Sequence, residues 1–186
     1  MKLKQLILLT FIAVFTTSSF AQTTGKNIDG VVMLPSRNAF DNLSANPNFS
    51  VFVTLVKSAG LTGTLNGQSA VTVFAPNNKA FAKLPLGLLD TLVKPENRAQ
   101  LVTLINNHLL AGKINSAGIA QQIKRSSGSA RFTTLAGTSL IAIIDGNRNI
   151  NITDGKGNKS IVSRFNAEQK NGILHAITEV LIPAVL

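Results

Sequence analysis

Residues 70–85, AVTVFAPNNKAFAKLP, contain the signals that decide the fold. The first six are β-branched, aromatic or small apolar residues, a run typical of a buried strand. Pro76 stops that run, and Asn77 is of a residue type that caps helices, here a short helix carrying Phe81. The sequence therefore predicts a strand over Ala70–Ala75 that turns directly into a helix.

Helical patterns flank this strand on both sides. Ahead of it, Asn46 and Pro47 can begin a helix and Gly60 can end it. The apolar stripe of that helix is Phe49, Phe52, Val53 and Val56, and a shorter element is expected over residues 37–43. Beyond the strand we expect short helices over 86–93 and 116–123. A longer helix between them opens at Pro95, with Leu101, Leu104, Ile105 and His108 on one face.

The spacing of the apolar residues along the chain changes after Arg131. Short strands are predicted over residues 132–135, 140–144, 149–153, 160–165 and 173–182, separated by Gly-containing turns. Residues 22–35 indicate a leader or an edge strand. Helices mainly in the first half and antiparallel strands in the second favour an α+β fold over a parallel α/β fold.

The N-terminus has the features of a secretory signal peptide. Lys2 and Lys4 precede an apolar run over residues 6–15, and Ser19 and Ala21 are small residues in the −3 and −1 positions. Ten apolar residues are too few for a membrane span, which needs about 20. We therefore expect a signal peptide over residues 1–21, cleavage after Ala21, and an exported chain that is periplasmic, surface-associated or secreted, with no transmembrane segment after cleavage.

Composition narrows the possible partners. The formal net charge is +10, and loss of Lys2 and Lys4 with the signal would leave +8. Lysine and arginine are scattered along the chain, whereas nucleic-acid-binding proteins gather them into a patch, so no nucleic-acid partner is expected. The chain has no cysteine, so an exported domain of this sequence must be held together by packing alone.

Two segments carry a family resemblance. Residues 72–85 (TVFAPNNKAFAKLP) resemble the first signature block of fasciclin domains, and residues 171–183 (NGILHAITEVLIP) resemble the closing block. Between them, Asn107 and His108 stand where the family usually has a Tyr-His pair before a strand. The chain thus resembles single-domain, bacterial-type fasciclin-like proteins of the beta-Ig-H3 kind, with the domain expected over residues 36–184.

The resemblance implies a β-wedge with helices packed around it, and a role in adhesion. We expect a structural role for the motif residues, namely Thr72, Phe74, Ala75, Pro76, Asn77, Phe81, Asn171, Gly172, His175 and Pro183. Thr178 stands where many members have Asp, as Asn107 stands in place of Tyr. The predicted contact region for a partner is Asn107, His108 and Leu109, with Thr178 and Glu179 on the closing strand.

No pattern of catalytic or metal-binding residues is present. His108 and His175 lie among apolar residues, which indicates histidines at the edge of the core whose ring nitrogens bond to backbone groups; the alternative is a general base or a metal ligand. No H-E-x-x-H, G-x-S-x-G or phosphate-binding loop occurs. We therefore predict no catalytic residues, no cofactor and no metal.

Three functions are compatible with these observations. The first is a non-enzymatic extracellular or periplasmic interaction module that binds proteins, matrix or surface glycans. The second is a carrier or sensor of a small apolar ligand held between helices and sheet. The third, an enzyme, requires a histidine beside an acid or a hydroxyl in an open cleft.

Overall fold

A computed structural model describes residues 24–185 of the chain. The predicted signal peptide lies outside the described residues. The helices of the described part are α1 (Ala39–Ser44), η1 (Pro47–Phe49), α2 (Ser50–Ala59), α3 (Thr62–Asn66), α4 (Asn78–Phe81), α5 (Leu88–Leu92), η2 (Pro95–Asn97), α6 (Arg98–Asn106) and α7 (Ser116–Arg125). The strands are β1 (Lys26–Ile28), β2 (Val31–Met33), β3 (Val71–Pro76), β4 (Leu109–Ala111), β5 (Ser129–Thr133), β6 (Ser139–Ile144), β7 (Ile150–Thr153), β8 (Lys159–Gln169) and β9 (Gly172–Ile177).

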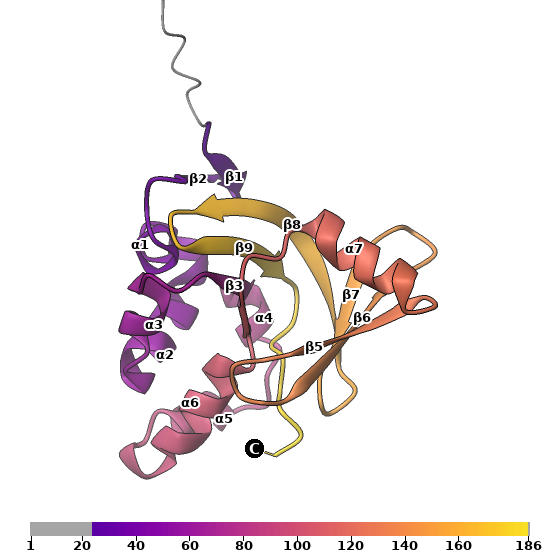
Figure 1. The fold of residues 1–186 in the computed structure, drawn as a ribbon. Coiled ribbons are helices and arrows are strands. Elements are labelled where there is room, and N and C mark those ends of the chain that lie inside the picture. Colours follow the sequence, from indigo (N-terminus) through magenta and orange to yellow (C-terminus); the bar gives the residue numbers. More distant parts are fainter. Residues whose placement is uncertain (1–23, 186) are drawn as a thin grey trace, which may run out of the picture.

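Seven of these strands form one sheet in the order β4-β3-β9-β8-β7-β6-β5. All neighbours pair antiparallel except β3 and β9, which run parallel with Val71 opposite Gly172. The two edges of the sheet meet at a bridge between Leu110 and Thr134, so the sheet nearly closes on itself. In Figure 1 helices α1–α6 lie on one side of the molecule, and α7 lies across the barrel-like half made by β5–β8.

The β3–β9 pair separates two hydrophobic cores. Val73 and Ala75 of β3 and Leu174 of β9 face the core beneath the helices, together with Phe52 and Phe81. Phe74, next to them in the chain, belongs to the barrel core. Because both faces of these two strands are covered, every residue of β3 and β9 is buried, which accounts for the continuous apolar run in the sequence.

The local signals of the helices act as predicted. The Asn46 side chain accepts a hydrogen bond from the Asn48 backbone, Pro47 begins η1, and Gly60 ends α2 with a left-handed φ of 76°. Asn77 caps α4 by accepting from the Ala80 N–H. The α+β architecture with helices in the first half is therefore confirmed.

Three predicted strands have wrong boundaries. The strand expected over residues 160–165 runs as β8 from Lys159 to Gln169, because it pairs with β9 until Gln169 lies opposite Gly172. The strand expected over residues 132–135 begins earlier, at Ser129, because it pairs with β6 from Ser129 to Thr133. The strand expected over 173–182 ends at Ile177. Its partner β3 ends opposite Ile177, at Pro76, so no ladder continues beyond that residue. Residues 26–33, expected as a leader or an edge strand, form the β1–β2 hairpin.

Candidate functional site

Residues 178–183 follow β9 outside any strand and run between the helices and the barrel-like half, the yellow trace near the C-terminus in Figure 1. We call this segment the C-terminal strap. Its backbone polar groups are satisfied largely by side chains in place of a strand ladder. These side chains come from the end of α6, from β8 and from the turn that precedes β8.

Asn107 and His108 hold the centre of the strap. Leu181 donates its N–H to His108 Nε2 at 2.9 Å, and Asn107 Nδ2 donates to the Leu181 carbonyl at 2.8 Å. His108 Nδ1 lies 2.8 Å from the Leu104 carbonyl and must carry the proton, because Nε2 is an acceptor. Burial lowers the pKa of His108 to about 4, against smaller raising effects from the Leu104 bond and the charge of Asp154. The ring is therefore neutral at pH 7.

Asp154 and Ser160 hold the two ends of the strap. Asp154, 5% exposed, accepts the Ile182 N–H on Oδ2 at 2.7 Å. Ser160 Oγ accepts the Glu179 N–H at 2.9 Å and donates to the Glu179 carbonyl at 3.2 Å. Each end of the strap is thus fixed by a side chain from the region where β7 turns into β8.

The structure divides the five predicted contact residues. Asn107, His108 and Leu109 have no exposed surface, so the contact prediction is wrong for them, because a fully buried side chain cannot touch a partner. Thr178 and Glu179 are half-buried at the surface end of the strap. Thr178 Oγ1 accepts the Ile161 N–H, and Glu179 forms an ion pair with Lys83.

The polar motif residues join elements that are far apart in the sequence. Asn171, 7% exposed, accepts the Ala39 N–H at 2.9 Å and donates to the Leu65 carbonyl at 2.8 Å. Thr72 Oγ1 donates to the Gly112 carbonyl and accepts the Ile114 N–H. A Cβ at position 172 would lie 1.9 Å from the Val71 carbonyl oxygen, so only glycine fits this close approach of β9 to β3.

The remaining motif residues lie in or beside the two cores. Phe74 and Ala75 have no exposed surface, Phe81 is 4% exposed, and Pro76 and Pro183 are buried. His175 packs against Phe74 with ring centroids 5.6 Å apart. Its Nε2 donates to the Ile114 carbonyl at 2.9 Å, and burial lowers its pKa.

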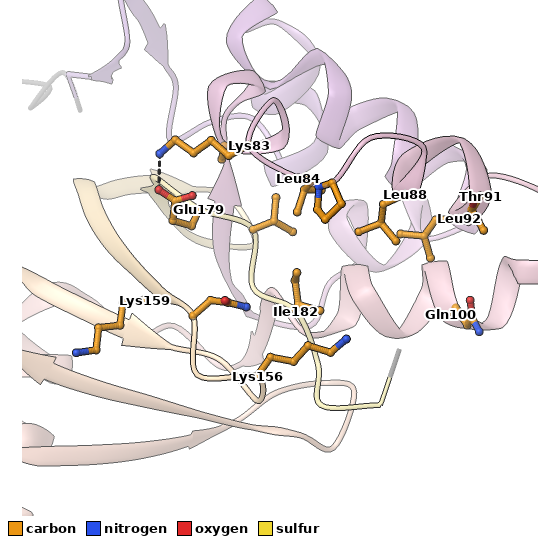
Figure 2. Close-up of a pocket in the computed structure, with 14 residues that line it drawn as sticks. Lys83, Leu84, Leu88, Thr91, Leu92, Gln100, Lys156, Lys159, Glu179 and Ile182 are labelled. Carbon is orange, nitrogen blue, oxygen red and sulfur yellow. Dashed lines mark hydrogen bonds and ion pairs between the residues drawn. The ribbon is translucent and has the colours of Figure 1, made fainter.

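A groove of about 780 Å³ lies beside the strap. Figure 2 shows Leu84, Leu88 and Leu92 along one side and Ile182 facing them. Lys156 extends on the side of Ile182 toward Gln100, while Lys159 points away from the leucines. Among the residues that the structure describes, Lys156 and Lys159 take part in no ion pair. Sequence reasoning missed this groove because its walls come from segments about 70 to 100 residues apart.

The described residues offer little for acid–base or metal chemistry. The ring nitrogens of both histidines are engaged with backbone groups, the longest contact being 3.4 Å from the Asn166 N–H to His175 Nδ1. Over residues 24–185 no three His, Cys, Asp or Glu side chains are grouped so as to hold a metal ion. In the same range, no helix has both the length and the apolar character needed to cross a bilayer.

Comparison with known proteins gives a consistent result. The fasciclin domain family model matches residues 47–183. Protein sll1483 of Synechocystis sp. is 34% identical over 140 residues, which cover 75% of this chain and 70% of that protein. Transforming growth factor-beta-induced protein ig-h3 of Sus scrofa is 32% identical over 156 residues, 84% of this chain. The match spans only 21% of the length of that larger protein.

A solved structure shares the fold. The FAS1 domain pair from the insect cell adhesion molecule Fasciclin I superposes with a TM-score of 0.69 at 22% identity. The superposition covers 83% of this chain and 54% of the solved chain.

Proposed function

Because the chain belongs to the fasciclin domain family, we propose that it is a non-enzymatic interaction module acting outside the cytoplasm, in adhesion or in binding of matrix proteins, surface proteins or glycans. The solved neighbour that shares its fold comes from a molecule described as a cell adhesion molecule. The proposed location, periplasmic, surface-associated or secreted, rests on the signal-like pattern of residues 1–21.

The observation that carries this proposal is the engagement of both histidines with backbone groups. A histidine that acts as a general base must present a ring nitrogen to its substrate, whereas His108 and His175 use their nitrogens to hold the strap and the segment around Ile114. Their buried rings also pack against phenylalanines, His108 against Phe52 and His175 against Phe74. These contacts support a structural role for both histidines.

We place the partner contact at the surface end of the strap. Thr178 and Glu179 reach the surface there beside Lys83, whose side chain is 54% exposed. The basic net charge favours anionic surfaces, and attraction between exposed charges weakens as salt is added.

A pull-down with the purified protein against surface and secreted extracts of its source organism tests the proposal. We expect capture of a protein or glycan that is released at moderate salt, and stronger capture by Glu179→Ala, because this change removes a negative charge from the contact and frees Lys83 for an anionic partner. Glu96→Ala removes the same charge from an exposed position on η2 and serves as the matched control. Equal capture by both variants would remove Thr178 and Glu179 from the contact, and a blank with every extract would overturn the proposed function.

The groove beside the strap favours a second candidate function, carriage or sensing of a small apolar ligand. Its volume lies within the range of about 300–1,000 Å³ that is typical of small-molecule sites. Native mass spectrometry of the protein as purified, before any delipidating step, tests this candidate. A bound mass lost on unfolding supports it, and a bare chain mass contradicts it.

A further inference from the structure

The groove combines an apolar floor with uncompensated positive charge. Leucines of the α4–α5 segment and Ile182 of the strap supply the floor. Three lysines line it, and its one acidic residue, Glu179, is already paired with Lys83. Lys156 therefore leaves an excess of positive charge on the side opposite the leucines, while Lys159, which also lines the groove, points away from them.

We propose that this groove binds a single-chain anionic amphiphile, with an aliphatic tail along Leu84, Leu88 and Leu92 and a carboxylate head beside Lys156. The proposal rests on the small-ligand function considered above and names the ligand class and the site. A tail removes apolar surface from water, which is the main source of affinity in such sites. A carboxylate complements the ammonium group of Lys156.

The lining also selects among ligand classes. No aromatic side chain lines the groove, so it lacks the flat platforms on which nucleobases stack. An uncharged apolar ligand would use the leucines but would leave the ammonium group of Lys156 without a counter-charge. An anionic amphiphile is the ligand class that matches both the apolar floor and the charge of Lys156.

Asp154 fixes the turn that carries Lys156 relative to Ile182 of the apolar floor. Its Oδ1 accepts the Lys156 N–H at 2.9 Å, while its Oδ2 accepts the Ile182 N–H at 2.7 Å. Next to it, a Cβ on Gly155 would lie 2.6 Å from the Ala184 backbone nitrogen, so the turn packs directly on the chain after the strap. The backbones of the head-group lysine and of the floor residue Ile182 are thus held by one buried carboxylate before any ligand arrives, which reduces the ordering cost of binding.

Calorimetric titration of the purified protein with octanoate, decanoate and decanol at pH 7.5 tests the proposal. We expect decanoate to bind about fifteenfold more tightly than octanoate, since each buried methylene is worth about fourfold in Kd. Decanol should bind more weakly than decanoate. Amide shifts in a ¹⁵N-labelled sample should concentrate in residues 84–92, 156–159 and 180–182.

Charge variants at exposed positions locate the head group. Lys156→Gln should weaken decanoate binding about two- to fivefold and leave decanol binding unchanged, the size expected for one exposed charge. Gln100→Glu, across the groove in Figure 2, should weaken decanoate by a similar factor through repulsion. Lys124→Gln and Gln121→Glu make the same changes at exposed positions on α7, away from the groove, and should match the wild type.

Three results would overturn the proposal: no saturable decanoate binding, decanol binding as tight as decanoate with no effect of Lys156→Gln, or amide shifts outside the groove. The titration uses no protein or glycan partner. A failed titration would therefore contradict only the ligand proposal, and a blank pull-down would contradict only the proposed interaction module.

Discussion

Two hairpin turns of the second half share one sequence pattern but differ in what they hold. Residues 145–149 (DGNRN) link β6 to β7, and residues 154–158 (DGKGN) link β7 to β8. In each, the aspartate accepts the N–H groups of the residues two and four positions later, at 2.8–2.9 Å. The fourth residue is left-handed in both, with φ 64° at Arg148 and 85° at Gly157.

The difference lies in the second carboxylate oxygen. Asp145 Oδ2 bonds to the nearby side chains of Asn149 and Asn151. The pKa of Asp145 is lowered, most by the bond from the Asn149 backbone N–H and next by the bond from the Asn151 side chain. Asp154 Oδ2 accepts the Ile182 N–H as well as the Asn158 side chain. The same local motif therefore closes a hairpin in one place and fastens the C-terminal strap in the other, according to whether a distant segment lies over it.

The largest expected effect comes from removing the fastening aspartate. Asp154→Ala deletes four hydrogen bonds and leaves the Ile182 N–H without its acceptor, so we expect a loss of about 4 kcal/mol in the free energy of unfolding. Urea denaturation measures it. Asp145→Ala also deletes four hydrogen bonds, but all four are local and lie at a more exposed position, where water can replace them, so this change should cost less. Equal losses would show that the strap contributes nothing to the difference between the turns.

The second-largest expected effect is a pH dependence of the free energy of unfolding. It comes from His108, which holds the centre of the strap. The pKa of His108 in the folded protein, about 4, lies below its ordinary value of 6.5, so between these values the unfolded chain binds more protons. The contribution of His108 to the free energy of unfolding should be fully present above pH 6.5. It should fall by roughly 3 kcal/mol as the pH drops to 4, and protonation of His108 should cause no further loss below that pH.

His108→Gln isolates this contribution, because His175 titrates in the same direction in both proteins. Urea midpoints from pH 7.5 to 4 should decline more steeply for the wild type than for His108→Gln. Parallel declines would mean that protonation of His108 does not oppose folding.

The smallest effect compares the glycines of the two turns. A Cβ on Gly155 would meet the Ala184 nitrogen at 2.6 Å, whereas a Cβ on Gly146 meets nothing within 4 Å. Gly155→Ala should therefore cost about 1–2 kcal/mol and Gly146→Ala less than about 0.5 kcal/mol. Thermal unfolding of the two variants side by side checks this, and a Gly146→Ala cost as large as that of Gly155→Ala would refute the close packing of Ala184 on the turn.

The same distinction between local and distant contacts explains what could be predicted from the sequence. Asn77, Gly60 and the Asp-Gly turns act within a few residues, so their patterns predicted the helices and hairpins. Asn107 and His108 were predicted as contact residues from their place in the family motif. Their bonds to Leu181, more than 70 residues away in the chain, could not be predicted from the neighbouring sequence. The groove was missed for the same physical reason, since Leu88, Lys156 and Ile182 come together only in the folded state.

The parallel pairing of β3 with β9 has a consequence for how the chain acquires its fold. Val71 meets Gly172 about a hundred residues later, so the strand pair that separates the two cores cannot form until almost the whole chain is available. Contacts between such distant residues raise the loop-closure cost of the transition state and slow folding. During synthesis on the ribosome, β3 must wait with its backbone unpaired on that side, so the domain folds as a unit only after residue 177 has emerged.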